Sequence, residues 1–105
     1  MTLRKDKLYG TAVIRSFRNK GLAECWRTGR AAGIPPELAV RVRNRLTALH
    51  RASDLGRLRE AGKFRLHRWK GAASEPWSID VSGPWRLTFE WRDGDAYRVD
   101  LEQPH

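Results

Sequence analysis

The sequence WSIDVSGPWRLTFEWRDGDAYRVDLE, residues 77–102, alternates apolar and polar side chains in the way that strands of a half-buried sheet do. Clusters of turn-forming residues divide it into three expected strands, 77–81, 85–91 and 97–102. Antiparallel hairpins would place one face of these strands on a hydrophobic core and leave the other face polar. This segment therefore predicts a mostly antiparallel, twisted sheet.

The hairpin register follows from the requirement that paired residues share a face. In the first hairpin we expect a three-residue loop over 82–84, which pairs Trp77 with Phe89, Ile79 with Leu87, Asp80 with Arg86 and Val81 with Trp85. In the second hairpin, a two-residue Asp-Gly turn would set Phe89 beside Arg98. We therefore expect a three-residue loop over 93–95, which sets Phe89 beside Val99. The polar face then carries Ser78, Asp80, Arg86, Thr88, Glu90, Arg98, Asp100 and Glu102.

Helical patterns precede the sheet. Asn19 is a suitable N-cap for a helix that runs to about Thr28. A second helix is expected from Pro35 to about Arg51, with apolar residues on one face at Leu38, Val42, Leu46 and Leu49. Short strands are expected at 13–17 and 64–69, and a surface connection at 52–63. The prediction is an α+β domain of order β-α-α-β-β-β, with two helices packed on one face of the sheet.

Charge and length bound the function. The 105 residues carry 21 Lys and Arg against 12 Asp and Glu, a net charge of +9. The excess lies in residues 1–63, with 15 basic and 5 acidic residues, whereas residues 64–105 have 6 and 7. A hydrophobic content of 40% supplies one core, and a single Cys excludes a disulfide scaffold and a thiolate-rich zinc site. We expect a polyanion or an acidic protein as partner.

The ends of the chain and the lack of long apolar runs suggest where the protein works. Residues 1–12 are polar and basic and are expected to form a flexible extension before a domain at 13–105. They lack the apolar stretch of a signal peptide, and no run in the chain is long enough for a membrane helix. The expectation is a cytoplasmic protein that does not contact a membrane.

The polar face of the sheet carries the candidate chemistry. His67 shares this face with Arg65 and Trp69, Lys70 follows just beyond, and Arg86 is central on a middle strand. With the terminal His105, these residue types suit cleavage of RNA, in which acid and base groups move protons and cations stabilise a charged transition state. No metal ligand set is expected among them.

Each candidate also has a structural interpretation. Arg86 can simply pair with Asp80 and Glu102 on neighbouring strands, and Trp69 can pack rather than stack on a base. Arg41, Arg43 and Arg45 on the second helix can be a solvated face or contacts to nucleic acid.

Several stretches, in this order, carry a family resemblance: Ile14–Leu22, the Thr28-Gly29 and Ala32-Gly33-Ile34 segment, Leu66–Gly71, Trp77–Val81, Trp85–Phe89, Asp93–Tyr97 and the final His105. Together they resemble the HigB toxins of bacterial toxin–antitoxin systems, in the RelE/ParE superfamily. The resemblance implies the RelE-like fold and an endoribonuclease that cleaves mRNA in the ribosomal A site by 2′-hydroxyl attack, with neither metal nor cofactor. It also implies a HigA-type helix-turn-helix antitoxin as partner, through which the complex binds operator DNA.

The resemblance assigns the site residue by residue. The family's His-x-x-Lys pattern falls on His67 and Lys70, and its strand arginine falls on Arg86. The family's usual ending, Tyr-Glu-Asp-Tyr-His, is Leu-Glu-Gln-Pro-His here, so Glu102 and His105 match it. The expected acid/base pair is His67 and His105, with Lys70 and Arg86 as phosphate cations, Asp80 and Glu102 as support, and Arg65, Arg68, Trp69, Arg41 and Arg45 as RNA contacts.

Two alternatives stay open, the first because of the departure at Gln103 and Pro104 and the second because of the basic charge. One is a toxin with weak or lost catalysis that acts by binding the ribosome or gyrase. The other is a basic nucleic-acid-binding module that uses the helix at 35–51.

Overall fold

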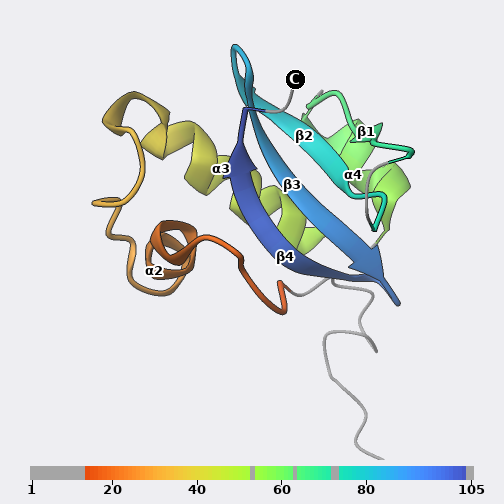
Figure 1. Cartoon of the computed structure of the whole chain (residues 1–105), viewed down its shortest axis with the longest axis horizontal. Helices are drawn as coiled ribbons and strands as arrows, with labels where there is room; N and C mark the ends of the chain where they lie inside the picture. The colour runs from red at the N-terminus through yellow and green to blue at the C-terminus, as the bar shows by residue number, and fades with distance from the viewer. Residues whose placement is uncertain (1–13, 53, 63, 72–73, 104–105) are drawn as a thin grey trace, which may run out of the picture.

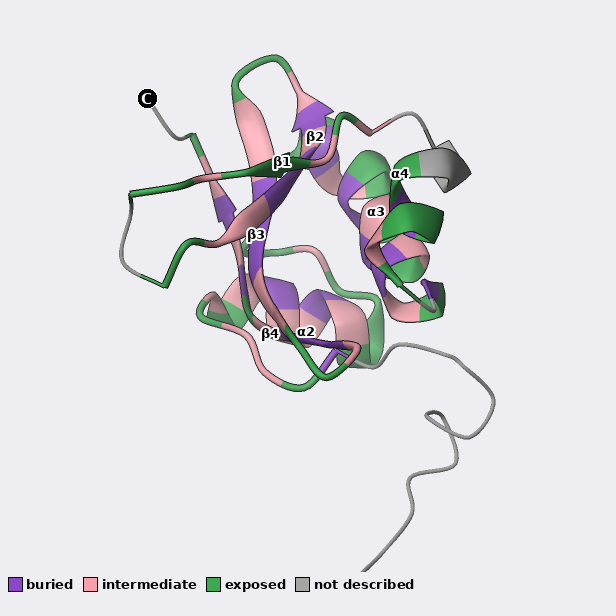
Figure 2. Ribbon diagram, turned by 90° about the vertical axis from the view of Figure 1, so that its right-hand side faces the viewer, coloured by how far each residue is buried: buried purple, intermediate pink, exposed green. Residues whose placement is uncertain are grey.

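The structure is a computed structural model that describes residues 14–52, 54–62, 64–71 and 74–103. Its sheet has the strand order β1-β2-β3-β4, and every neighbouring pair is antiparallel. The strands are β1 His67–Arg68, β2 Trp77–Ser82, β3 Trp85–Arg92 and β4 Asp95–Glu102. Helices α3 (Ala39–Arg51) and α4 (Leu55–Gly62) lie on one side of the sheet, and α2 (Lys20–Thr28) lies beside β4 (Figures 1 and 2). The α+β class is confirmed, while the extension expected at 1–12 lies outside the described residues.

Helix α2 begins and ends at the residues that the sequence indicated. The Asn19 side-chain oxygen accepts a hydrogen bond from the Leu22 backbone N–H at 3.0 Å. At the other end Gly29 has φ 81°, the left-handed conformation that glycine adopts without strain, and its N–H donates to the Cys25 carbonyl. Leu22 and Cys25 are buried, so the helix is attached to the core by its apolar face.

Replacing Asn19 by Ala is expected to lower the free energy of unfolding by about 1 kcal/mol, because the Leu22 N–H loses its acceptor. Urea unfolding of the two proteins measures the difference. Asn19→Asp keeps an acceptor oxygen and should stay close to the parent protein. An equal loss in both variants would show that the cap does not stabilise α2.

The second predicted helix is confirmed with one refinement at its start. A 3₁₀ turn, η1 (Pro36–Leu38), precedes α3, because the proline ring fits the first turn of a helix. The predicted apolar face is the buried one, formed by Leu38, Val42, Leu46 and Leu49.

The segment at 52–63, predicted as a surface connection with room for a turn of helix, instead forms a third helix, α4, over most of its length. The Asp54 carboxylate accepts from the Arg57 N–H at 2.8 Å, as a helix cap does, and Leu58 is fully buried. Leu55 and Leu58, three residues apart, were the sequence signal for this helix.

The strand expected at 13–17 is reduced to two isolated parallel bridges, Ile14 to Ala96 and Phe17 to Val99. Residues 14–17 do not form a continuous strand with β4, because Arg98, between the two bridged residues of β4, has φ 53° instead of the extended backbone of its neighbours. An ion pair between Arg15 Nε and the buried Asp95 carboxylate, at 3.0 Å, still fastens this segment to β4.

Both hairpins have the predicted face but a different turn. In the first, Trp77, Ile79 and Asp80 pair as predicted, but Ser82 rather than Val81 lies opposite Trp85. The turn therefore has two residues, Gly83 and Pro84, and a bulge at Val81 restores the alternation.

The rejection of a two-residue Asp-Gly turn in the second hairpin is wrong. Arg92 pairs with Asp95 around Asp93 and Gly94, whose φ values of 52° and 79° suit the tight turn that this dipeptide favours. The register then shifts between Thr88 and Glu90, so Leu87 still pairs with Leu101. The bulge removes the clash that the sequence argument assumed, since two residues of β4 share the place opposite Phe89.

Candidate active site

A cavity of about 310 Å³ opens on the polar side of the sheet, between β1 and the hairpin of β2 and β3. Its walls are formed by Arg65, Leu66, His67, Trp69, Asp80 and Arg86. The alternation of β2 and β3 places Asp80 and Arg86 opposite each other on this side. Five of the predicted site residues therefore meet in one place.

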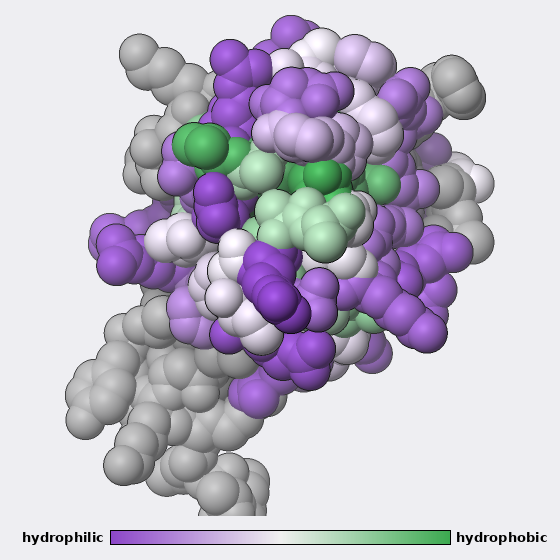
Figure 3. Space-filling view, turned by 90° about the vertical axis from the view of Figure 1, so that its left-hand side faces the viewer, coloured by the Kyte–Doolittle hydropathy of each residue, from purple (hydrophilic) through white to green (hydrophobic). Residues whose placement is uncertain are grey.

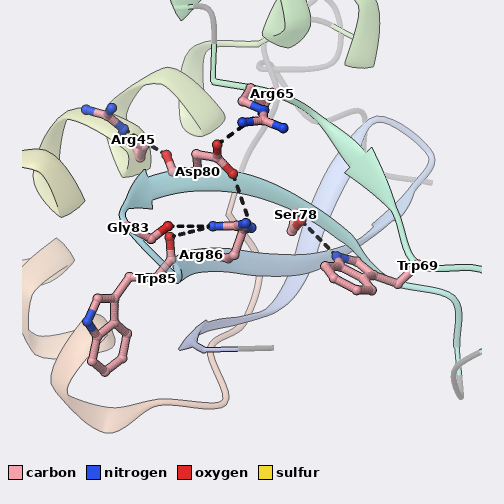
Figure 4. Close-up of polar contacts among 8 residues, drawn as sticks. All are labelled: Arg45, Arg65, Trp69, Ser78, Asp80, Gly83, Trp85 and Arg86. Carbon is pink, nitrogen blue, oxygen red and sulfur yellow. Dashed lines mark hydrogen bonds and ion pairs between the residues drawn. The ribbon is translucent and has the colours of Figure 1, made fainter. Parts of the chain in front are cut away.

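Asp80 is the centre of this cluster. Its carboxylate oxygens lie 3.1 Å from Arg86 Nε and 3.6 Å from Arg65 Nε, and its backbone carbonyl accepts from Arg45 Nε at 3.1 Å (Figure 4). The Asp80 and Arg86 side chains are only 28% and 27% exposed, so water screens this pair less than a surface ion pair. One carboxylate thus holds two guanidinium groups at the cavity.

Arg86 is the most firmly held of these cations. Besides the bond to Asp80, its Nη1 donates to the Gly83 carbonyl at 3.0 Å and to the Trp85 carbonyl at 3.4 Å (Figure 4). No hydrogen bond of Arg86 Nη2 occurs within the part of the chain that the structure describes. A fixed guanidinium with one remaining donor group is well suited to bind an anionic oxygen.

His67 and Trp69 form the opposite wall. Their rings meet at a centroid distance of 4.6 Å and an angle of 81°, edge to face. The indole N–H of Trp69 donates to the hydroxyl of fully buried Ser78 at 2.8 Å, which fixes the indole on the sheet. His67 itself is exposed, so its imidazole can reach a ligand in the cavity.

Other predicted site residues lie outside this cavity. Lys70 is exposed and does not line it. Arg68 pairs with Glu75 at 3.1 Å and lies over the Trp77 ring. The Glu102 carboxylate accepts from the Thr88 hydroxyl instead of pairing with Arg86, although Glu102 is opposite Arg86 in the strand register. His105 lies outside the described residues.

The two arginines predicted on the second helix differ in their surroundings. Arg41 is exposed and donates to the Ser82 hydroxyl, whereas Arg45 lies over the Phe64 ring at 4.5 Å. Burial lowers the pKa of Arg45, the charge of Arg41 lowers it further, and Asp80 opposes both. Figure 3 shows the end of the molecule that carries α2 and the start of α3, where a few apolar residues are surrounded by hydrophilic ones.

Sequence reasoning missed the groups that hold the site rather than the groups that face the ligand. These are the Ser78 hydroxyl, which anchors Trp69, and the Gly83 and Trp85 carbonyls, which anchor Arg86. The alternation of the predicted strand places Ser78 on the polar face, and this position was a usable signal for the role of its hydroxyl. The hydrogen bonds from Arg86 to the two carbonyls depend on the geometry of the turn between β2 and β3, which we predicted incorrectly from the sequence.

Comparison with known proteins places this geometry in a family. The family model described as "RelE-like toxin of type II toxin-antitoxin system HigB" matches residues 15–105, which include the whole cavity. The chain belongs to the HigB-like toxin family. It is also 37% identical to a Proteus vulgaris protein named "Endoribonuclease HigB" over 93 residues, which are 89% of this chain and 100% of that relative.

Three further observations describe this HigB-like toxin. Among residues 14–52, 54–62, 64–71 and 74–103, no group of three His, Cys, Asp or Glu side chains is arranged to hold a metal ion. No helix in the same residues is long and apolar enough to cross a membrane. The lone Cys25 is buried, and burial raises the pKa of its thiol despite the nearby charge of Arg43.

Proposed function

We propose that this HigB-like toxin cleaves mRNA in the A site of the bacterial ribosome and so stops translation and growth. The chain is an endoribonuclease toxin of a type II toxin–antitoxin system, as its family match and its similarity to Endoribonuclease HigB indicate. The observation that carries the finer proposal is the cavity in which exposed His67 lies with two arginines held by Asp80.

These side chains suit the attack of a ribose 2′-hydroxyl on the neighbouring phosphate. A base removes the 2′-hydroxyl proton while the 2′-oxygen forms a bond to phosphorus. The bond from phosphorus to the 5′-oxygen breaks, and an acid delivers a proton to that oxygen. The products are a 2′,3′-cyclic phosphate and a 5′-hydroxyl end. Arg86, fixed by an ion pair and two hydrogen bonds, stabilises the charge that develops on the phosphate oxygens.

The remaining roles complete the proposed site. His67 and His105 act as the acid/base pair, and Lys70 adds a positive charge beside the phosphate. Arg65, Arg68, Trp69, Arg41 and Arg45 contact RNA of the message or the ribosome, which the net charge of +9 favours. Asp80 and Glu102 support the cations and the sheet on which they lie.

The proposed partners follow from the same function. A HigA-type helix-turn-helix antitoxin neutralises the toxin, and the complex of the two binds operator DNA through the antitoxin. The ribosome is the site of action, which places the toxin in the cytoplasm.

Mapping of 5′-hydroxyl RNA ends tests the proposal in a translating extract. We expect new 5′-hydroxyl ends inside coding regions, in phase with A-site codons. Blocking translation initiation should reduce the number of these ends at least about tenfold. Equal cleavage of free RNA would contradict the dependence on ribosomes. Growth arrest without new 5′-hydroxyl ends would instead favour a toxin that acts by binding the ribosome or gyrase.

A further inference from the structure

A second cavity, of about 270 Å³, lies on the sheet beside the first. Its walls are formed by Arg18, Ser74, Pro76, Thr88, Phe89, Glu90, Arg98 and Glu102, none of which lines the first cavity. The two cavities are nevertheless close. Thr88 follows Arg86 by two residues on the same side of β3, and it pairs across the sheet with Ser78, which anchors Trp69. The second cavity is therefore within reach of an RNA strand that enters the first.

The polar groups of the second cavity differ in how far they are buried. The Thr88 hydroxyl, on a residue only 6% exposed, donates to Glu102 Oε2 and holds that carboxylate in place. Glu102 Oε1 accepts no hydrogen bond from any described residue. Glu90 is paired with Arg98 at 3.1 Å, so its charge is balanced within the cavity, whereas Glu102 has no ion pair with a described residue.

The cations of this cavity are nearer to water. The Arg98 side chain is 54% exposed, and Arg18 is exposed with no ion pair to the described part of the chain. A ligand that fits has N–H donors for the deep carboxylate and an anionic group for the outer arginine. A nucleotide whose base carries an amino group has both.

We propose that the second cavity binds a nucleotide next to the cleaved bond, with Glu102 accepting from the amino group of adenine, cytosine or guanine and Arg18 contacting its phosphate. Uracil is disfavoured, because it has no amino group and its one base-edge N–H donor, at N3, lies between two carbonyl oxygens that repel the carboxylate. The cavity thus selects bases at one position of the message. This inference rests on the proposed function, since it assumes RNA in the first cavity.

Binding to the purified full chain tests the inference without any cleavage. The probes are RNA trinucleotides with 2′-O-methyl groups, which cannot undergo 2′-hydroxyl attack, and they differ in one base at a time. At one position we expect uracil to weaken binding roughly tenfold relative to the amino-bearing bases, the low end of the discrimination from a base-edge contact.

Glu102→Gln is the informative variant. Thr88 can still donate to its carbonyl oxygen, which leaves an NH₂ group toward the base, so the preference against uracil should vanish or reverse at that position alone. Asp93→Asn removes the same charge at an exposed turn residue outside both cavities and should leave the preference unchanged. If Glu102→Gln does not fold, Thr88→Val removes the hydroxyl that holds the carboxylate and should weaken the preference.

Several results would overturn the proposal. One is binding without base preference in the parent chain, and another is a preference that Glu102→Gln leaves intact. A third is a variant that alters affinity for the antitoxin and not for RNA, which would make this cavity a protein contact. Cleavage maps of the same variants separate the two proposals: if the trinucleotides bind with the expected preference and no RNA is cleaved, only the proposed function fails.

Discussion

His67→Ala is expected to lower the rate of mRNA cleavage by about 10²–10⁴-fold, the usual contribution of a positioned acid or base. The imidazole is exposed at the cavity wall and lies beside the arginines that would hold the phosphate. Loss of the ring removes one of the two proton transfers while the cations remain. Counting of 5′-hydroxyl ends per minute in a translating extract measures the effect, and the double variant His67→Ala with His105→Ala should abolish growth arrest.

The His67→Ala variant is expected to lose cleavage activity without losing stability. Because His67 is exposed, its removal should alter the free energy of unfolding by no more than about 0.5 kcal/mol. His50→Gln changes a histidine that packs on Trp26, away from the cavity, and should keep its cleavage rate per folded molecule. If the His67→Ala protein cleaves at more than a tenth of the parent rate, His67 is not the acid or base of the reaction.

Arg86→Ala is expected to slow cleavage by about 10²–10³-fold, as the loss of one preorganised donor to a developing oxyanion does. An ion pair and two hydrogen bonds hold the guanidinium before any RNA arrives, so little reorganisation is needed in the transition state. Single-turnover rates at saturating ribosomes report this step. Arg86→Lys should recover only part of the rate, because an ammonium group cannot keep the bonds to Asp80 and the turn and also reach the phosphate.

A second arginine on the same strand provides the control. Arg92 lies on β3 at its far end, stacked over the Tyr97 ring at 4.1 Å and outside the cavity. Arg92→Ala should therefore keep most of the cleavage rate despite the same loss of charge. Equal losses in Arg92→Ala and Arg86→Ala would mean that overall charge, and not the fixed geometry of Arg86, accounts for the effect.

The sequence was sufficient for the elements whose signals are local. Asn19 and Gly29 delimit α2 as expected, because a cap needs only the residues of one turn. The face of each strand was also predictable, since alternation requires only that Ile79, Leu87 and their neighbours be buried together.

The turns were not predictable by the same rule. The argument against an Asp-Gly turn assumed a regular ladder, and a bulge near Arg98 breaks that assumption. Helix α4 was missed for a different reason: it is short, and its stability comes from packing Leu58 into the core rather than from a long apolar pattern.

For the candidate site, the sequence predicted which residues face the ligand but not how they are held. Parity alone places Asp80 opposite Arg86, and the ion pair between them is present. The Gly83 and Trp85 carbonyls also accept hydrogen bonds from Arg86. Their positions depend on the backbone conformation of the turn, which the side-chain pattern did not reveal. Glu102 was expected beside Arg86 and is instead bound to Thr88, because two acceptable partners lie within reach on the same side of the sheet.

The bulge in β4 determines which side chains after Arg98 face the core. With a two-residue turn and no bulge, Leu101 would fall opposite Arg86, and Asp100 would enter the core beside Leu87. The extra residue near Arg98 returns Leu101 to the core and Glu102 to the polar side. Because the extra residue offsets the tight Asp-Gly turn, deletion of Arg98 would leave a regular ladder with Val99 opposite Phe89 and Leu101 still opposite Leu87. In a strand without a bulge, the same one-residue deletion would reverse every side chain that follows. The bulge is therefore a position in β4 where the loss of one residue keeps inside and outside as they are.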